Sequence, residues 1–328
     1  MGVNVLSLFD GISCGRLALE RAGIEVDAYY ASEIDESPEK ISKKNWPDII
    51  RLGDINGWKS WELPKIDLVI GGSPCQGFSR NGYCLNFEDP RSRLFFVYVE
   101  IWNHLKEKNP DIKFFLENVE MKKEWRDVIT EYMGKQPVLI NSKLVSAQSR
   151  PRMYWSDIPG VTMPEDKGIK LIDILNPGYM GEVTEKNGMK FGPGIYEAEK
   201  DLISIVDGQV RVRQATKNGY IVAEPGDGVN LSMPKSKTRR GRVIKEKSPT
   251  LDTGCNVCVY DGKMIRGLEI TELERLQTLP DGYTDAGVKE VDRKKAIGNG
   301  WTVDVIVHFM MAFRKYWMEK EAAGGQDT

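Results

Sequence analysis

The sequence predicts an α/β protein built on a doubly wound, mostly parallel sheet, accompanied by a smaller, irregular domain. Three observations support this fold class. Short apolar segments rich in β-branched residues alternate with helical patterns through the first half of the chain. Some of these apolar segments are unbroken, as is typical of strands buried on both faces. The alternation stops near Pro159-Gly160, and from there to about Ser248 the chain is rich in glycine, proline and charge.

The expected elements follow from the spacing of the apolar residues. Strands are predicted at residues 3–9, 26–32, 48–52, 66–70, 112–116, 138–145 and 153–155. Helices are predicted at residues 16–22, 92–108 and 302–320, and another between a capping box at residues 271–274 and Pro280. The last helix is apolar on one face, so we expect it to dock on the first sheet. The final residues, 321–328, are expected to fray.

Composition and charge exclude several classes of protein. The 328 residues are 41% hydrophobic and 29% charged, which is ordinary for a soluble globular chain. No apolar run reaches the roughly 18 residues of a membrane helix, and no signal peptide opens the sequence. Five cysteines predict no disulfide framework and favour a reducing, cytoplasmic setting. The net charge is −2, so any attraction to nucleic acid must be local.

A glycine-containing turn, Asp10-Gly11-Ile12-Ser13-Cys14-Gly15, follows the first predicted strand. Glycine lets a ligand approach the backbone, and the following helix offers free N–H groups at its N-terminus. Glu33 ends the second strand, where it could grip ribose hydroxyls. Asp54 follows the third strand, where it could read an adenine amino group. The pattern predicts an adenosine-containing cofactor, with a plain tight turn as the alternative.

Two further residues follow predicted buried strands and are candidates for catalysis. Cys75 lies in a turn after residues 66–70, where Pro74 stiffens the backbone beside the thiol. This position favours a nucleophile, and the alternative is a buried structural cysteine. Glu117 follows residues 112–116 directly, either as a proton donor or as an acid at a helix N-terminus.

Arg150 and Arg152 alternate along a predicted extended segment. Side chains two residues apart in a strand point to the same face. Two guanidinium groups on one face suit phosphate or carboxylate contacts, and a solvated edge is the alternative.

Taken together, these motifs and their order resemble the carbon-5 cytosine-specific DNA methyltransferases. The resemblance is carried by residues 9–15, Pro74-Cys75-Gln76, Glu117-Asn118-Val119, residues 148–152, 248–253 and 272–277, and Gly298-Asn299. These segments span nearly the whole chain apart from about 160–247. Asp10-Gly11 and Trp301-Thr302-Val303 are similar to the de novo animal branch and to related phage and bacterial enzymes. Because the chain opens at the first motif, we expect a standalone methylase of prokaryotic or phage type.

The resemblance implies a Rossmann-like enzyme that methylates carbon-5 of a cytosine flipped out of duplex DNA. The methyl donor would be S-adenosyl-L-methionine, and the product S-adenosyl-L-homocysteine. The implied catalytic residues are Cys75, which attacks carbon-6, Glu117, which neutralises charge at ring nitrogen N3, and Arg152 with Arg150. The implied cofactor contacts are Phe9, Asp10, Gly11, Gly15, Glu33, Asp54, Pro74, Leu94 and Asn299. The implied DNA contacts are Gln76, Ser79, Arg239, Arg240 and Arg242.

The chemistry implied by the resemblance needs no metal. Cys255 and Cys258 form a lone C-x-x-C pair without the second ligand pair that is typical of a zinc site. We therefore expect no metal ion.

A local basic segment could supply the attraction to DNA that the whole chain lacks. Residues 235–247 hold seven basic residues against the single acid Glu246. Such a segment can hold phosphates and read guanine edges through arginine, and a solvated charged loop is the alternative. The resemblance implies a catalytic domain at 1–160, a target-recognition domain at 161–247 and a segment at 248–328 that completes the catalytic domain. It implies double-stranded DNA as a partner, no membrane, and leaves open a cognate restriction endonuclease encoded nearby.

Other functions account for fewer of these features. A nicotinamide dehydrogenase would use the glycine turn and Glu33 but has no need of Pro74-Cys75. A thiol hydrolase would need a histidine beside its nucleophile, and the chain has only His104 and His308, both in predicted helices. An RNA cytosine methylase is closer, although the long insertion and its basic loop favour DNA. A DNA-binding relative without activity would have no use for the implied catalytic set.

Overall fold

The computed structural model describes residues 2–74, 93–179, 181–186, 189–192, 195 and 202–324. The chain forms two compact units. The first unit comprises residues 1–141, 151–164 and 303–328, and the second comprises residues 142–150 and 165–302. These two units are defined by which residues pack together. The expected division into catalytic and target-recognition domains, with boundaries at residues 160 and 247, stays a prediction.

The first unit is built on a seven-stranded sheet in the order β3-β2-β1-β4-β5-β7-β6. Its strands are β1 (Val3–Leu8), β2 (Val26–Ser32), β3 (Ile50–Arg51), β4 (Leu68–Gly71), β5 (Lys113–Val119), β6 (Val138–Asn141) and β7 (Pro151–Ser156). The pairs among β1 to β5 are parallel, and β7 runs antiparallel to both β5 and β6. The predicted fold class, an α/β protein with a mostly parallel sheet, is confirmed.

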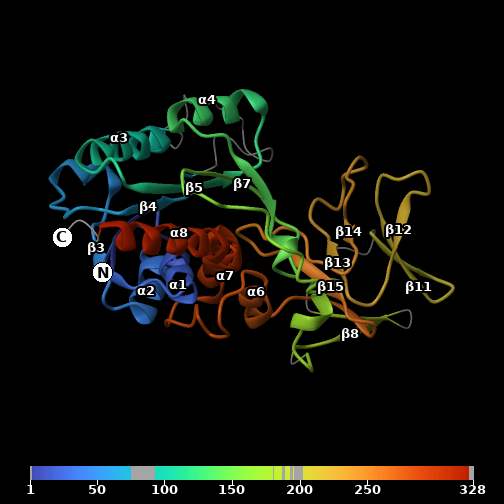
Figure 1. Cartoon of the computed structure of the whole chain (residues 1–328). Coiled ribbons are helices and arrows are strands. Elements are labelled where there is room, and N and C mark those ends of the chain that lie inside the picture. The colour runs from blue at the N-terminus through green and yellow to red at the C-terminus, as the bar shows by residue number, and fades with distance from the viewer. Residues whose placement is uncertain are drawn as a thin grey trace. The chain divides into compact units, whose positions relative to one another are not determined.

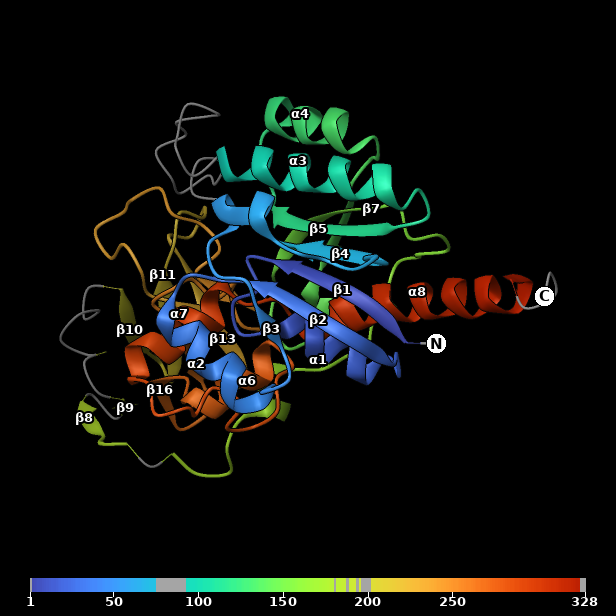
Figure 2. The same cartoon turned by 90° about the vertical axis from the view of Figure 1, so that its left-hand side faces the viewer.

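Helices cover both faces of this sheet, which explains why the central strands are apolar on both sides. The helices are α1 (Cys14–Arg21), α2 (Glu36–Asn45), α3 (Arg93–Lys108), α4 (Lys123–Met133) and α8 (Val303–Gly324), with a 3₁₀ helix η1 (Ile55–Ser60). Figure 1 shows α3 and α4 on one face and α1 and α8 on the other, and Figure 2 shows the same layers after a quarter turn.

The last helix docks on the sheet as its apolar face predicts. Phe309 of α8 packs against Phe115 of β5 and Tyr154 of β7, with ring centroids 5.0 and 5.3 Å apart. Phe313 is fully buried one turn further along the helix. The last helix therefore completes the layer of helices that covers β5 and β7.

The second unit consists mostly of antiparallel strands. A three-stranded sheet has the order β10-β11-β12 and a six-stranded sheet the order β14-β13-β15-β16-β9-β8. The strands are β8 (Thr184–Lys186), β9 (Met189–Phe191), β10 (Ile203–Val206), β11 (Gln209–Arg213), β12 (Tyr220–Ala223), β13 (Asp227–Asn230), β14 (Val243–Ile244), β15 (Val257–Tyr260) and β16 (Met264–Gly267). The helical elements are η3 (Ser142–Leu144), η4 (Leu171–Ile174), α6 (Ile270–Leu276) and α7 (Glu290–Asn299).

The structure corrects several expected elements. The strand expected at residues 138–145 is the shorter β6 followed by η3, and the strand expected at 48–52 is the two-residue β3. The helix α6 is opened by a capping box between Glu269 and Glu272, not by one at residues 271–274. In the described chain no single helix is long and apolar enough to cross a membrane, although α7 and α8 pass on length and composition as a bent pair.

Candidate active site

The turn after β1 bends sharply and leaves open space beside the backbone. Phe9, Gly11 and Ser13 all have left-handed backbone conformations, with φ of 60°, 58° and 60°. A Cβ atom added at Gly11 would meet no described atom within 4 Å. Only glycine adopts this conformation without strain, so the residue both forms the turn and keeps its outer side clear. Gly15 is buried in the first turn of α1.

Glu33 lies beside this turn, at the end of the neighbouring strand β2. Its Oε2 accepts a hydrogen bond from the backbone N–H of Gly11 at 2.8 Å. Its Oε1 accepts from the N–H groups of Ile34 and Asp35 at 2.7 and 2.8 Å. The carboxylate is thus fixed against the glycine turn, and each oxygen retains acceptor capacity for a ligand hydroxyl.

Asp10 supports the turn from within. Tyr29 donates a hydrogen bond from its hydroxyl to Oδ1 at 2.7 Å, and Ser13 donates to Oδ2. Burial raises the pKa of the Asp10 carboxyl above its ordinary value, although the hydrogen bonds from Ser13 and Tyr29 act in the opposite direction. With Gly11, Glu33 and Gly53, Asp10 lines a small cavity of about 40 Å³. The residues expected at the cofactor turn therefore gather around one hollow.

Three other residues expected to contact the cofactor occupy different environments. Asp54 is exposed and caps η1, where Oδ1 accepts from the backbone N–H of Asn56 at 2.9 Å. Leu94 opens α3 half-buried against the apolar core. Pro74 ends the first described segment of the chain and is half-buried. The structure gives each a place in the first unit, and their contacts with a cofactor stay predictions.

Glu117 and Arg152 form an ion pair in the middle of the sheet's antiparallel part. Arg152 Nε lies 3.0 Å from Glu117 Oε1, and the two side chains are 13% and 12% exposed. Arg152 faces Val119 across the β5–β7 ladder, so it lies two residues from Glu117 on the same face. An ion pair so little exposed is weakly screened, and it fixes the direction of the Glu117 carboxyl.

Asn118 connects β5 to the end of β4. Its Nδ2 donates to the Ser73 carbonyl oxygen at 3.3 Å and to Ser73 Oγ at 3.1 Å. Both residues are buried. Ser73 stands two residues before Cys75, so this contact fixes the backbone that leads to the expected nucleophile. The prediction of site residues missed Asn118, although the Glu-Asn-Val motif contains it.

Three expected site residues lie outside the described residues: Cys75, the predicted nucleophile, and Gln76 and Ser79, predicted DNA contacts. What the structure does describe is the lead-in to them, through Gly71 and Ser73, and the acidic and basic partners on β5 and β7.

Arg150 belongs to the second unit and is buried. Its guanidinium donates to the carbonyl oxygens of Leu251, Gly298 and Gly300 at 2.9, 3.0 and 3.1 Å. It therefore joins two late segments that carry the family resemblance, residues 248–253 and the segment around Gly298-Asn299. Its predicted part in catalysis or phosphate binding stays untested by these contacts.

Asn299 is exposed at the end of α7, in the same unit. The preceding Gly298 lies so close to the neighbouring segment that an added Cβ atom would stand 2.1 Å from the Asp252 carbonyl oxygen. The close approach places Asn299 directly after a backbone contact that only glycine permits.

The predicted DNA-binding arginines differ in exposure. Arg240 is exposed and Arg239 half-buried. Arg242 is 1% exposed, and its guanidinium donates to the carbonyl oxygens of Ser232 and Met233, each at 2.9 Å. Within this segment Arg240 is thus the arginine most open to a ligand.

Nothing among the described residues resembles a metal centre. No three histidine, cysteine or acidic side chains there are grouped to hold an ion. Cys255 and Cys258 are buried and form no disulfide with each other, and burial raises the pKa of Cys255 to about 12. A thiol with such a pKa is a poor source of the thiolate that binds zinc.

Comparison with known proteins gives the sequence relationship. A family model described as C-5 cytosine-specific DNA methylase matches residues 3–154. The orphan methyltransferase M.Rho11sI of Bacillus phage rho11s is 41% identical over 119 residues, or 36% of this chain and 23% of that protein. The type II methyltransferase M.NgoBV of Neisseria gonorrhoeae is 37% identical over 122 residues, or 36% of this chain and 28% of that protein. The match thus spans about a quarter of the length of these relatives.

Solved structures of methyltransferases are similar in fold to this chain. The methyltransferase EhMeth of Entamoeba histolytica matches with a TM-score of 0.64 and 16% identity, over 96% of this chain and 99% of that one. At this identity the likeness shows a shared fold. Residues 3–154 form a C-5 cytosine-specific DNA methylase domain, and the fold of the chain is shared with a solved methyltransferase.

Proposed function

We propose that the protein transfers a methyl group from S-adenosyl-L-methionine to carbon-5 of a cytosine extruded from duplex DNA. The proposal is supported mainly by the arrangement at the ends of the adjacent strands β4 and β5. There Asn118 donates a hydrogen bond to Ser73. The preceding residue, Glu117, forms an ion pair with Arg152. An acid and a guanidinium fixed beside the lead-in to Cys75 suit addition of a thiolate to a pyrimidine ring.

The turn after β1 suits the methyl donor. The open space beside Gly11 admits a ligand to the backbone, and the Glu33 carboxylate can accept hydrogen bonds from ribose hydroxyls. Phe9, Asp10, Gly15, Asp54, Pro74, Leu94 and Asn299 are the further residues that we assign to this site. When bound, S-adenosyl-L-methionine supplies an electrophilic methyl group to carbon-5 of the base.

The residues of the chain activate the base. The Cys75 thiolate forms a bond from sulfur to carbon-6, and the displaced electron pair of the ring is neutralised by a proton that Glu117 donates to N3. Arg152 holds the Glu117 carboxyl and offers its other N–H groups to the ring carbonyl. Carbon-5 is then electron-rich enough to accept the methyl group. Arg150 acts at a distance, by keeping the late segments together.

The second half of the reaction restores the aromatic ring. The carbon-5 proton leaves to water, its electron pair re-forms the ring double bond, and the bond between carbon-6 and the Cys75 sulfur breaks. N3 returns its proton to Glu117, so the thiolate and the acid are ready for another cycle. Base, methyl donor and enzyme thus balance to 5-methylcytosine, S-adenosyl-L-homocysteine and one released proton.

We assign recognition of DNA to residues 161–247, with residues 1–160 and 248–328 forming the catalytic part. Arg239 and Arg240 stand in the basic segment and are open enough to reach phosphates or base edges. Gln76 and Ser79 are assigned to the flipped base and its neighbours. Because the relatives come from a bacterial phage and a bacterium, we assign its action to the cytoplasm of a prokaryotic host. The orphan and type II names of the relatives support, respectively, action alone and action beside a restriction endonuclease.

The proposal is tested by covalent capture. Bisulfite sequencing of host DNA, with and without the gene, first identifies the methylated sequence. A duplex of that sequence with 5-fluorocytosine at the target, incubated with S-adenosyl-L-methionine, is expected to trap the protein because fluorine cannot leave as a proton does. Mass spectrometry should place the cross-link on Cys75. Cys75→Ser should neither methylate nor cross-link, whereas the matched Cys84→Ser should do both.

Two results would contradict the proposal. A folded Cys75→Ser variant that still transfers the methyl group would exclude this nucleophile. Methyl transfer to tRNA at a higher kcat/KM than to the mapped duplex would instead identify an RNA cytosine methylase.

A further inference from the structure

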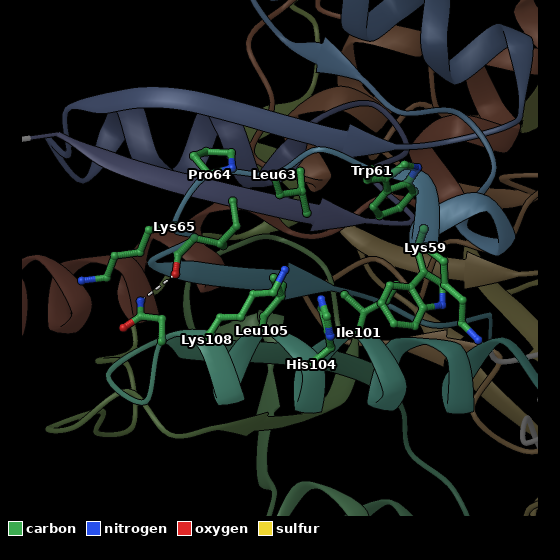
Figure 3. Close-up of a pocket in the computed structure, with 12 residues that line it drawn as sticks. Lys59, Trp61, Leu63, Pro64, Lys65, Ile101, His104, Leu105 and Lys108 are labelled. Carbon is green, nitrogen blue, oxygen red and sulfur yellow. Dashed lines mark hydrogen bonds between the residues drawn. The ribbon is translucent and has the colours of Figure 1, made fainter.

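A second cavity lies in the first unit, away from the cofactor turn. It has a volume of about 710 Å³ and lies between residues 58–66 and the C-terminal half of α3, as Figure 3 shows. Ligand pockets in proteins commonly have volumes of roughly 300–1,000 Å³. Asp10, Gly11 and Glu33 belong to a different hollow. The cavity is therefore large enough for a cofactor-sized molecule and is separate from the site of the proposed methyl donor.

The walls of this cavity are aromatic and apolar. Trp58, Trp61 and His104 contribute flat rings, and Ile101 and Leu105 of α3 contribute aliphatic side chains. The Trp58 and His104 rings meet edge to face, with centroids 5.3 Å apart and planes at 61°. Both tryptophans are only half-buried, so ring surface is left for a ligand to cover. Such walls suit a planar, unsaturated ligand.

The rim of the same cavity is cationic. Lys59, Lys65 and Lys108 line it, and no aspartate or glutamate does. Figure 3 shows Lys65 and Lys59 at opposite ends of the group of lining residues, with Lys108 of α3 between them. Within the described ranges none of the three ammonium groups pairs with a carboxylate. Their charge is therefore available to a bound anion, and it is spaced around an apolar centre.

We propose that this cavity binds a nucleoside phosphate, with the base against the indole rings and the phosphates held by the lysines. Aromatic walls together with three lysines indicate this class of ligand. A purely apolar molecule would make no use of the lysines, and a bare phosphate would leave the aromatic walls uncovered. A peptide or a duplex strand is disfavoured because the volume fits one small molecule. This binding is independent of the methyl transfer proposed above.

The cavity also has a defined relation to the catalytic edge of the sheet. Ile66, one of the residues that line it, leads into β4, whose other end continues to Gly72, Ser73 and Pro74. Asn109 ties the end of α3 to this same lead-in by donating from Nδ2 to the Ile66 carbonyl oxygen at 2.8 Å. A ligand here would thus contact α3 and the segment that leads into β4.

The test measures binding to the full chain by isothermal titration calorimetry. ADP is the probe, with adenosine and inorganic pyrophosphate as its two halves, and S-adenosyl-L-homocysteine is present in excess to fill the other site. ADP is expected to bind saturably and at least about tenfold more tightly than either half, a difference of roughly 1.4 kcal/mol. Raised salt should weaken ADP more than adenosine.

Two variants and a matched control locate the binding. The double variant Lys65→Glu/Lys108→Glu should weaken ADP by about tenfold or more, since both changes reverse rim charges. Trp58→Ala should weaken ADP and adenosine but not pyrophosphate. Lys43→Glu, a single charge reversal at an exposed position of α2, should leave binding of all three ligands unchanged. Circular dichroism checks that each variant is folded.

Several results would overturn the inference: no saturable heat with ADP up to about 1 mM, the upper end of useful small-ligand affinity; equal affinity for ADP and pyrophosphate; or a charge-reversal variant that binds as Lys43→Glu does. Binding of ADP that appears only when S-adenosyl-L-homocysteine is left out would assign the nucleotide to the cofactor turn instead.

Discussion

The side-chain amide of Asn118 donates to both oxygen atoms of Ser73, at 3.3 Å to the carbonyl and 3.1 Å to the hydroxyl. The two residues are 45 positions apart in the sequence, at the ends of adjacent parallel strands. One residue earlier, the Glu117 carboxylate forms an ion pair with Arg152. Of two successive residues of β5, Asn118 thus holds the backbone before Cys75, and Glu117 is the acid that we propose acts on the base.

Asn118→Asp is expected to reduce kcat for methyl transfer by about tenfold to a hundredfold, in line with the loss from a misplaced reacting group. The change removes both donors and sets a carboxylate against the Ser73 carbonyl oxygen. The free energy of unfolding should fall by about 1–3 kcal/mol, as for other buried groups left unpaired. Single-turnover rates and urea unfolding measure the two effects.

Asn109→Asp is the matched control for Asn118. Asn109 is also buried, and its amide donates to a backbone carbonyl at the opposite end of β4. It should lose comparable stability but keep kcat, because it lies away from Pro74. Equal losses of kcat in the two variants would show that Asn118 acts through stability alone.

Much of the first unit could be predicted because its strands have clear local patterns. β2 (Val26–Ser32) was predicted to the residue, and β1 and α3 to within one residue, since unbroken apolar runs ended by turns have few alternatives. α2 and α4 were missed: α2 is a largely polar surface helix with only Ile41 and Ser42 buried. Its pattern carries too few apolar positions to be distinguished from a loop.

The partners of site residues were harder to predict than their identities. Glu117 and Arg152 were each singled out, but their pairing depends on the antiparallel register of β5 and β7, which no local pattern encodes. The sequence predicts Arg150 and Arg242 as cations open to a ligand, yet both guanidinium groups are buried on backbone carbonyls. Such carbonyls lie up to 150 residues away in the sequence. The sequence therefore identifies the arginine donor but does not indicate which carbonyl groups accept its hydrogen bonds.

Arg150→Lys and Arg152→Lys should separate stability from catalysis. Lysine keeps the charge but loses the planar fork, so Arg150→Lys leaves at least one of three buried carbonyls unpaired. The free energy of unfolding should fall by about 1–3 kcal/mol. Arg152→Lys should instead lower kcat by about tenfold or more with a smaller change in stability, because its partner is a half-buried carboxylate. The reverse pattern would exchange the roles that we assign to the two arginines.

Gly298→Ala should weaken binding of S-adenosyl-L-methionine. The added methyl group would stand 2.1 Å from the Asp252 carbonyl oxygen, so the end of α7 must shift and carry Asn299 with it. Overpacking of this kind costs typically about 1–3 kcal/mol. Calorimetric titration should show a raised Kd, and Gly57→Ala, where the same methyl group meets open space, should bind as the parent does.

Arg240→Ala should weaken binding of the mapped duplex and flatten its dependence on salt. Removing a cation that neutralises one phosphate lowers the slope of log K against log salt by about 0.9. Arg242→Ala should instead lower the thermal midpoint, since its guanidinium is buried on the Ser232 and Met233 carbonyls. Fluorescence anisotropy at several salt concentrations distinguishes the two, and an unchanged slope for Arg240→Ala would remove it from the DNA interface.

Cys255 should make the protein less stable at high pH. Burial raises the pKa of its thiol to about 12, while the thiol of the unfolded chain titrates near 8.5. The folded form therefore keeps a proton that the unfolded form loses, so the stabilising contribution is fully present below about pH 8.5 and is lost as the pH rises toward 12. Between about pH 9 and 10.5, the free energy of unfolding should fall by up to about 1.4 kcal/mol per pH unit more in the parent than in Cys255→Ala. Urea unfolding across this range measures the difference.

Alkylation checks the cause independently. At pH 8, iodoacetamide should spare Cys255 in the folded chain and modify it in urea. Rapid modification without urea would mean that the thiol is not buried and that its pKa is not raised.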